Sequence, residues 1–241
     1  MAKNKTGTGK LYLIPTTLGG NEPLEVLPIS IKQAIEDIDH YIVENEKSAR
    51  RFIKKISPRK SQPSLHISVL NKYTEVEEIP SLLKPCLEGY NTGILSEAGC
   101  PGIADPGADV VSIAHDKSIQ VIPLVGPSSI ILAVMASGMN GQSFAFNGYL
   151  PIDTPERKSA IKRLEKLSRD SRQSQLFIET PYRNDKLFAE LVKTLHPNTR
   201  LCIACDITLP NEYIATKTAH DWKKTNVELH KRPTIFIVQG Q

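Results

Sequence analysis

The sequence lacks several features that mark common protein classes. Its 241 residues contain no run of about twenty apolar residues, the length that a membrane-spanning helix requires. Residues 1–10 are basic but have neither an apolar stretch nor a small-residue cleavage site, so we expect no secretory signal. An HExxH pattern and a GxSxG motif are also missing, which disfavours a zinc protease and a hydrolase with a nucleophilic serine elbow.

Cysteine is scarce, and its placement predicts no disulfide or metal chemistry. The four cysteines are Cys86, Cys100, Cys202 and Cys205. With no secretory signal, this low number favours a reducing cytoplasmic location. Cys202 and Cys205 form a CxxC pattern, but they fall in a predicted strand, where a spacing of three directs the two sulfurs to opposite faces. We therefore expect buried free thiols and no metal ion.

Positive charge is in slight excess and gathers on two predicted helices. The net charge is +4, which is compatible with a nucleic-acid partner but does not demand one. Lys47, Arg50, Arg51, Lys54, Lys55, Arg59 and Lys60 occupy the first basic segment, and Arg157, Lys158, Lys162, Arg163 and Lys166 occupy the second. Each segment is interpreted either as a surface that contacts RNA phosphates or as a solvated helix face.

Strand-like and helix-like segments alternate along the chain, which predicts an α/β fold with many parallel strand pairs. Strands are expected at 10–14, 41–43, 65–70, 92–96, 118–123, 144–146, 175–179, 200–205, 212–217 and 233–238. Helices are expected at 28–38, 46–56, 75–88, 107–117, 127–137, 155–168, 184–195 and 219–224, with Pro80 and Pro85 interrupting the helix over 75–88. Because two strands follow each other closely near the end, the second sheet should be more antiparallel.

Proline and glycine interrupt the chain near its middle. Pro123 and the pair Gly126-Pro127 predict the break between two lobes. The expected organisation is a flexible tail over 1–9, an N-terminal α/β lobe over 10–124 and a C-terminal α/β lobe over 125–241.

Three loops that follow predicted strands are rich in glycine, proline and small polar residues. They are residues 15–20, 96–107 and 125–129. Ligands of open α/β sheets sit beyond the carboxyl ends of strands, and glycine lets the backbone approach a ligand closely. The loop 96–107 holds three glycines, two prolines and two acids, more than a plain connection needs. The interpretations are a ligand loop or a tight double turn.

Together with other segments, these loops resemble the tetrapyrrole methylase superfamily of S-adenosylmethionine-dependent methyltransferases. Within it, the likeness is to the ribosomal RNA small subunit methyltransferase I family, which methylates the 2′-oxygen of a cytidine. Residues 11–19 (LYLIPTTLG) are similar to LYxVPTPIGN, and 94–107 (ILSEAGCPGIADPG) to VSDAGTPxISDPG. Residues 121–129, 136–138, 146–151 and 177–183 match further motifs in the same order.

The resemblance implies a fold, a cofactor and a set of contacts. It implies a homodimer of two-lobed chains, each with two αβα lobes and the cofactor S-adenosylmethionine in the cleft between the lobes. Carried over by position, the cofactor contacts are Pro15, Ala98, Gly99, Cys100, Pro101, Ile103, Ala104, Asp105, Ser128, Ser129, Tyr149, Leu150, Pro233 and Thr234.

The segments expected near the methyl acceptor depart from the family pattern. Asn45 replaces an acid, Tyr182 replaces a histidine, and Leu209 and Asn211 replace a lysine and a histidine. Residues 66–75 lack the family's histidine pair. The remaining candidates for a catalytic base are Glu44, Glu179, Asp206 and Glu212, with Arg183 as a clamp for a phosphate or carboxylate. Each of these charges can also be read as a surface or ion-pairing group.

The sequence therefore predicts a cytoplasmic methyltransferase that acts on ribosomal RNA, free or in the small ribosomal subunit, at the ribose 2′-oxygen of a cytidine. Two alternatives stay open. One is a methyltransferase for a small molecule such as a tetrapyrrole. The other is a catalytically idle relative that binds the cofactor or RNA.

Overall fold

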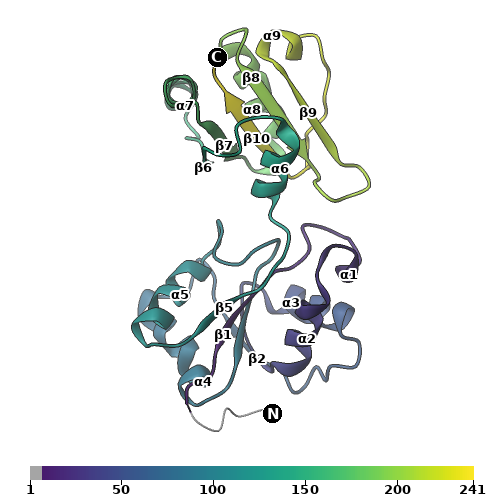
Figure 1. Cartoon of the computed structure of the whole chain (residues 1–241), viewed down its shortest axis with the longest axis vertical. Helices are drawn as coiled ribbons and strands as arrows, with labels where there is room; N and C mark the ends of the chain where they lie inside the picture. Colours follow the sequence, from purple (N-terminus) through teal and green to yellow (C-terminus); the bar gives the residue numbers. More distant parts are fainter. Residues whose placement is uncertain (1–6) are drawn as a thin grey trace. The chain divides into compact units, whose positions relative to one another are not determined.

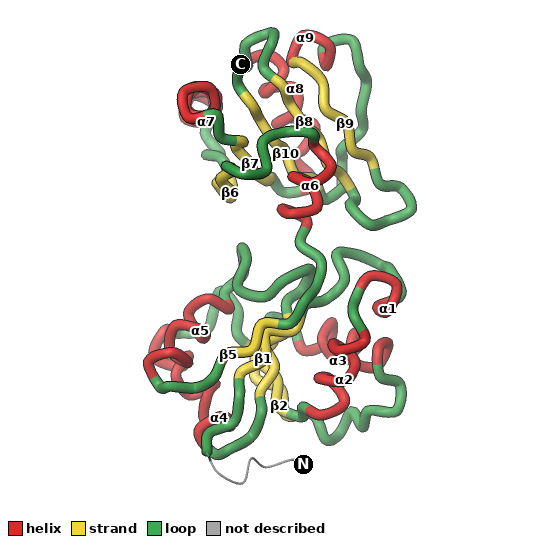
Figure 2. Tube along the Cα trace, in the orientation of Figure 1, coloured by secondary structure: helices red, strands yellow, loops and turns green. Residues whose placement is uncertain are grey.

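A computed structural model gives the fold of the protein and describes residues 7–241. Contacts between Cα atoms divide the chain into two units, Met1–Ser128 and Ser129–Gln241. The division falls after Ser128, past the Gly126-Pro127 pair, whereas the sequence analysis placed it after residue 124. Figures 1 and 2 show the elements of each unit. None of the described helices is long and apolar enough to cross a membrane.

The first unit is built on a sheet of five parallel strands in the order β3-β2-β4-β1-β5. The strands are β1 (Leu11–Ile14), β2 (His40–Val43), β3 (His66–Val69), β4 (Thr92–Leu95) and β5 (Val121–Pro123). The helices are α1 (Pro23–Val26), α2 (Ile29–Asp37), α3 (Glu46–Ile56), η1 (Val76–Leu83), α4 (Lys84–Leu87) and α5 (Gly107–Asp116). All five strands end at one edge of the sheet because they run parallel.

Helices cover both faces of this sheet, as the alternation of side chains along the strands requires. Tyr41 and Val43 of β2 pack with α2 and α3 in one core, whereas Ile42 between them packs with η1 and α5 in the other. Leu95 and Ile94 of β4 divide between the same two cores. The uninterrupted apolar runs that predicted buried strands thus reflect burial on two sides.

One expectation for the first unit needs correction, and another is confirmed. Gly9, expected in a flexible tail, is buried, and its N–H donates a hydrogen bond to the carbonyl of Cys86 over 2.7 Å. Residues 1–6 of the expected tail lie outside the described residues. A Cβ atom at Gly9 would lie 2.0 Å from the Tyr90 carbonyl oxygen, so glycine is required there. The helix expected over 75–88 with interruptions at Pro80 and Pro85 is a 3₁₀ helix followed by the short α4, because proline removes a backbone donor from α-helical hydrogen bonding. The expected interruption is confirmed.

The second unit contains a mixed sheet in the order β6-β7-β10-β8-β9. The strands are β6 (Phe144–Tyr149), β7 (Ser174–Ile178), β8 (Arg200–Cys205), β9 (Tyr213–Thr218) and β10 (Thr234–Gln239). Only β6 and β7 are parallel, which confirms the expectation of a more antiparallel second sheet. The helices are α6 (Ser129–Ser137), α7 (Thr154–Ser171), η2 (Pro181–Arg183), α8 (Asn184–Thr194) and α9 (Ala219–Trp222).

The core of the second unit lies between α7, α8, α9 and one face of the sheet. Leu164 of α7, Leu191 of α8 and Trp222 of α9 pack against Phe177 and Phe236 of the central strands. The helix α6 packs against β8, β9 and β10 (Figure 1). Both parallel strands, β6 and β7, lead into helices, so α7 and α8 both begin at the edge where those two strands end.

A buried ion pair joins α7 to α8. Arg157 donates through Nε and Nη2 to Glu190 Oε2, over 2.7 and 2.6 Å. The two side chains are only 5% and 8% exposed. Arg157 Nη1 also donates to the carbonyls of Pro151 and Ile152, so the guanidinium ties both helices to the segment that leads out of β6. Arg157 is therefore a structural cation, not part of the surface basic face that the sequence suggested.

Because breaking a buried pair leaves an uncompensated charge, Arg157→Met should lower the free energy of unfolding by about 3–5 kcal/mol. The double variant Arg157→Met/Glu190→Leu should recover part of that loss. Urea unfolding followed by circular dichroism measures both. The control Arg169→Met removes an exposed pair with Asp170 and should change stability by less than about 1 kcal/mol. Equal effects of Arg157→Met and Arg169→Met would contradict this assignment.

Candidate functional site

The loops that follow β1 and β4 are joined at the carboxyl edge of the first sheet. Ile14 and Leu95, the last residues of these strands, are register partners. Just beyond them, the Thr16 N–H donates to the Gly99 carbonyl over 3.0 Å, and Thr16 Oγ1 donates to the Ser96 carbonyl over 3.2 Å. Ser96 Oγ also donates to the Gly99 carbonyl. Pro15 and the loop 96–107 are thereby held together, as the ligand-loop interpretation requires.

The loop after β5 packs against both of the others. Cys100 Sγ lies 3.4 Å from the Pro127 carbonyl oxygen, which accepts its hydrogen bond. A Cβ atom at Gly126 would lie 2.2 Å from the Cβ of Pro15, so no other residue fits at 126 without movement of the loops. Gly99 adopts φ +76°, and a Cβ there would lie 3.1 Å from the Pro127 carbonyl oxygen. The three expected ligand loops therefore form one close-packed cluster.

Asp105 holds the turn that precedes α5. Its Oδ1 accepts hydrogen bonds from the N–H groups of Gly102 and Gly107, over 2.7 and 2.9 Å. Between them, Ala104 has φ +59°, a conformation that a residue with a Cβ atom rarely adopts. The side chain of Ile103 is consequently held outward and is 54% exposed. The acid thus shapes this loop through its backbone, a role that the sequence did not reveal.

Three carboxylates gather at the same edge of the first unit. Partial burial raises the pKa of Glu44, and the negative charges of Glu97 and Asp105 raise it further. Glu97 also accepts a hydrogen bond from Ser48 Oγ over 2.6 Å. Glu97 was not among the predicted site residues, because its position in the sequence does not indicate that it lies beside Glu44. A carboxylate with a raised pKa accepts a proton more readily than an ordinary one.

The replacement of an acid by Asn45 preserves a structural role. Asn45 Oδ1 accepts from the N–H groups of Lys47 and Ser48, over 3.0 and 3.2 Å, and so caps the first turn of α3. Either asparagine or aspartate performs this function, which keeps Glu44 at the end of β2 beside the helix.

A cavity of about 240 Å³ opens between the β1 loop, the β4 loop and α3. Its lining includes Thr16, Ser96 and Glu97 from the loops, and Arg51 and Lys55 from α3. The cavity therefore combines both signs of charge with hydroxyl groups. The transferred cofactor contacts do not line it, so it is separate from the Ala98–Asp105 turn.

The candidates of the second unit also share one edge of a sheet. Tyr149 of β6 pairs with Ile178 of β7, which pairs with Ile235 of β10. Ile235 in turn pairs with Ala204 of β8. The residues next to this row are Leu150, Glu179, Arg183, Asp206, Glu212, Pro233 and Thr234. Leu150 is buried in the core, so only its backbone is placed to contact a ligand, whereas Tyr149 is exposed.

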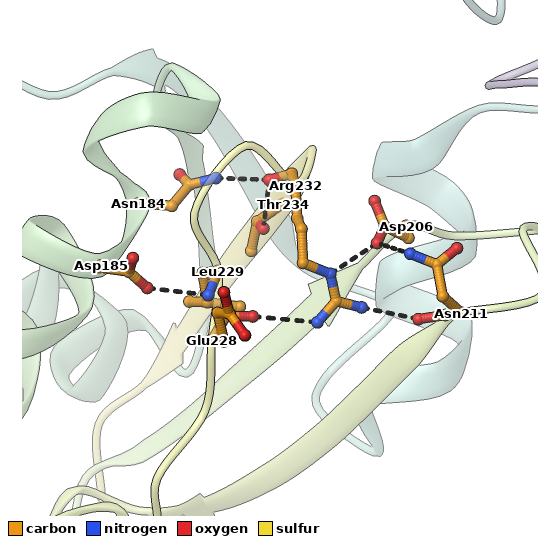
Figure 3. Close-up of polar contacts among 8 residues, drawn as sticks. All are labelled: Asn184, Asp185, Asp206, Asn211, Glu228, Leu229, Arg232 and Thr234. Carbon is orange, nitrogen blue, oxygen red and sulfur yellow. Dashed lines mark hydrogen bonds and ion pairs between the residues drawn. The ribbon is translucent and has the colours of Figure 1, made fainter.

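Asp206 is fixed in a polar network at this edge (Figure 3). Arg232 Nε donates to Asp206 Oδ2 over 2.6 Å, and Arg232 Nη2 donates to the Asn211 carbonyl over 2.6 Å. The Asn211 side chain also donates to Asp206 Oδ2. The hydrogen bond to Asp206 raises the pKa of Arg232, which stays charged. Asn184 donates to the Arg232 carbonyl and anchors that segment to α8. Because these donors occupy its carboxylate, Asp206 is a poor candidate for a general base.

The other two acids of the second unit are also engaged. Glu179 Oε1 accepts from Arg183 Nη2 and from the Thr180 N–H, both over 2.6 Å, and Glu179 is buried. Glu212 Oε2 accepts from the N–H of Thr208, which has φ +72°. These contacts make Glu179 and Glu212 supports of the local backbone. Ser129 begins α6 and Ser128 precedes it. Their roles as cofactor contacts stay predictions, as do those of the other transferred positions.

Three of the seven cations of the first basic segment form ion pairs. Arg50 pairs with Glu46 over 2.7 Å, Lys55 with Glu22 over 3.2 Å, and Lys60 with Asp39 over 2.6 Å. Lys54 Nζ donates to the Pro58 carbonyl over 2.7 Å. The remaining four cations form no ion pair within the described part of the chain, so contact with RNA phosphates and a solvated helix face both stay predictions.

Within residues 7–241, no group of three or more histidine, cysteine or acidic side chains is arranged to hold a metal ion. The four cysteines are free, and burial raises the pKa of both the Cys202 and the Cys205 thiol. Free thiols in a strand agree with the prediction made for the CxxC pattern.

No family model matches the chain. Curated relatives are nevertheless similar to it. The ribosomal RNA small subunit methyltransferase I of Streptococcus pyogenes serotype M6 is 30% identical over 181 residues, 75% of this chain and 59% of the relative. That of Vibrio cholerae serotype O1 is 27% identical over 246 residues, all of this chain and 81% of the relative. The chain thus spans 59% of the length of the first relative.

Solved structures share the fold. The methyltransferase CobJ superposes with a TM-score of 0.64 at 14% identity, over 97% of this chain and 95% of that one. Uroporphyrin-III C-methyl transferase from Thermus thermophilus, complexed with S-adenyl homocysteine, has a TM-score of 0.56 at 16% identity, over 96% and 97% of the two chains. These likenesses confirm the expected tetrapyrrole methylase fold.

Because the Cβ of an alanine at 126 would overlap Pro15, Gly126→Ala should reduce the free energy of unfolding by about 1–3 kcal/mol. Urea unfolding measures this change. Gly20→Ala is the matched control, since a Cβ at Gly20 meets no atom within 4 Å. If Gly126→Ala were as stable as Gly20→Ala, the two loops would not be in the close contact described.

Removing the charge of Glu97 should lower the pKa of Glu44, because the carboxylate of Glu44 then meets less repulsion. Carbon-13 NMR titration of the side-chain carboxyl in Glu97→Gln measures the shift, which should leave the pKa nearer to its ordinary value. Glu25→Gln removes an exposed acid of the same unit and serves as the control. A Glu44 pKa that stays the same or rises in Glu97→Gln would refute the coupling.

Proposed function

We propose that the chain is a member of the tetrapyrrole methylase superfamily, similar to ribosomal RNA small subunit methyltransferase I, and that it transfers a methyl group from S-adenosylmethionine to ribosomal RNA. The observation that carries the proposal is the close-packed cluster of loops after β1, β4 and β5. These are the loops whose sequences resemble the family motifs, and they lie at the edge of the sheet where α/β folds bind ligands.

The residues of the cluster fit the proposed cofactor. Ile103 and Val125 are apolar but 54% and 75% exposed, and they offer surfaces to an adenine ring. Gly99 and Gly126 leave their loops without side chains at the points of contact, so backbone groups can come close to a ligand. When bound, S-adenosylmethionine supplies an electrophilic methyl group on a sulfonium centre. The loops would hold it through the backbone around Ala98–Asp105, with Pro15 beside them.

Glu44 is the carboxylate best placed to act as the base. The pKa of Glu44 is raised by burial and by its neighbouring acids, whereas Glu179 and Asp206 are bound by Arg183 and Arg232. A ribose hydroxyl must lose its proton to attack the methyl group, and a carboxylate with a raised pKa accepts that proton more readily than an ordinary one. Arg183 keeps its exposed edge free for a phosphate, because Nη2 alone is paired with Glu179.

The finer points of the proposal rest on the family resemblance. They are a cytidine 2′-oxygen as the acceptor, a cytoplasmic homodimer as the working form, and cofactor contacts from Ser128, Ser129, Tyr149, Leu150, Pro233 and Thr234. The replacement of family residues by Asn45 and Asn211 is compatible with this role, because both asparagines preserve local hydrogen bonds.

Calorimetric titration with S-adenosylmethionine and transfer of its tritiated methyl group test the proposal. Specific cofactor binding and tritium incorporation into small-subunit ribosomal RNA are the expected results. Transfer to a tetrapyrrole but not to RNA would make it a small-molecule methyltransferase. Cofactor binding without transfer to either acceptor would identify an idle relative, and no cofactor binding by the folded protein would refute the proposal.

Glu44→Gln should lower the rate of methyl transfer by about 10²–10⁴-fold, because the glutamine cannot accept the proton. Cofactor affinity should stay within about twofold of the unaltered protein. Single-turnover kinetics with tritiated S-adenosylmethionine measures the rate, and Glu25→Gln controls for the loss of one acid from the same unit. An undiminished rate in Glu44→Gln would remove Glu44 from the catalytic role.

A further inference from the structure

The second unit contains a groove between α7 and α8. Its volume is about 530 Å³, and Thr154, Lys158 and Lys162 of α7 line it opposite Lys186, Glu190 and Lys193 of α8. The four lysines are exposed side chains. Four ammonium groups, two from each helix, therefore line one groove that α7 and α8 form together.

None of these four lysines forms an ion pair within the described part of the chain. The acid in the lining, Glu190, does not neutralise them, because its carboxylate is bound by the buried Arg157. The groove thus keeps its positive charge. This differs from the first basic segment, where Lys55 and Lys60 are paired with acids.

Folding alone gives no reason for this arrangement. Lys158 and Lys162 are four residues apart on one face of α7, where like charges repel and weaken a helix. Lys186 and Lys193 add two more positive charges across the groove. The repulsion among these lysines is offset when a polyanion occupies the groove, because its negative charges attract all four ammonium groups.

The four groove lysines lie at increasing distances from the edge of the second sheet that holds the candidate residues. Both α7 and α8 start where the parallel strands β6 and β7 end, next to Tyr149 and Glu179. Lys186 lies in the first turn of α8, and Lys158 lies in the second turn of α7. Lys162 lies about 6 Å further along α7, and Lys193 about 10 Å further along α8, at 1.5 Å per residue. The charges therefore form a track that leads from the edge of the sheet.

We infer that this groove binds the phosphate backbone of the RNA substrate. The inference rests on the proposed function, since it assigns a binding surface to the proposed acceptor. Lysine ammonium groups are point charges without a fixed hydrogen-bond geometry, so the groove positions a strand without reading its bases. Bases would be read elsewhere, at the residues near the reacting hydroxyl.

Removal of three groove lysines tests the inference against an equal loss of charge elsewhere. The groove variant is Lys158→Gln/Lys162→Gln/Lys193→Gln. The control variant is Lys166→Gln/Lys223→Gln/Lys224→Gln, whose lysines are exposed, lie outside the groove and belong to the same unit. Both variants have the same net charge, so a general effect of charge on RNA binding affects both equally.

Fluorescence anisotropy with purified small-subunit ribosomal RNA measures affinity over a series of salt concentrations. The groove variant should bind at least about tenfold more weakly near 0.1 M salt, and its slope of log affinity against log salt should fall by about 2 to 3. The control variant should stay within about twofold of the unaltered protein. Equal affinities of the two variants would overturn the inference.

Lysine acetylation provides a second measurement that needs no variant. Bound RNA should protect Lys158, Lys162, Lys186 and Lys193 from acetylation, as detected by mass spectrometry, while Lys166 stays reactive. Inorganic polyphosphate is the comparison probe. Protection by polyphosphate without protection by RNA would show a site for another polyanion and overturn the assignment to RNA.

The outcomes separate this inference from the proposed function. Both variants should bind S-adenosylmethionine as the unaltered protein does. If the protein methylates ribosomal RNA but the groove variant binds RNA normally, only the groove assignment fails. If RNA binds through the groove but receives no methyl group, the proposed activity fails while the groove assignment stands.

Discussion

The approach of Gly126 to Pro15 is the contact on which the candidate cofactor site depends. Two loops from non-consecutive parts of the chain meet at the carboxyl edge of the first sheet, and the space between them has no room for a side chain. The hydrogen bonds from Thr16 to Gly99 and from Cys100 to Pro127 then draw the third loop into the same cluster. A close-packed frame of this kind fixes backbone groups before any ligand arrives, which reduces the entropy lost on binding.

Charged residues that resemble each other in sequence perform different tasks in the structure. Arg157 and Asp206 are buried and satisfied by partners, so they stabilise the second unit. Glu44 is repelled by neighbouring acids, so its carboxyl keeps a proton more readily. Lys158 forms no ion pair among the described residues and lines the groove between α7 and α8. These differences come from the surroundings of each side chain, since the charges themselves are alike.

The acids of the second unit stabilise the local backbone at its edge. Glu179 and Asp206 each receive an arginine, and Asp206 also receives the amide of Asn211. Two of the substitutions that separate this chain from the family pattern, Asn45 and Asn211, have local structural explanations, because each side chain forms hydrogen bonds there. The tetrapyrrole methylase fold and the similarity to ribosomal RNA small subunit methyltransferase I agree with that view, since the loops that carry the resemblance are intact.

The sequence by itself determined the type and order of the elements and the loops that form the candidate site. The helix at 46–56 and the strand at 200–205 have the bounds predicted from periodicity. The burial of one face of a helix, or of a whole strand, produces a pattern of apolar residues that is local in the sequence. Only the tertiary structure decided which charges are free. Arg157 and Lys158 are adjacent and both basic, yet one points to Glu190, 33 residues away along the chain, and the other lines the groove. Whether a charged side chain forms an ion pair depends on a partner that folding brings near. The local sequence pattern does not indicate which distant residue that partner is.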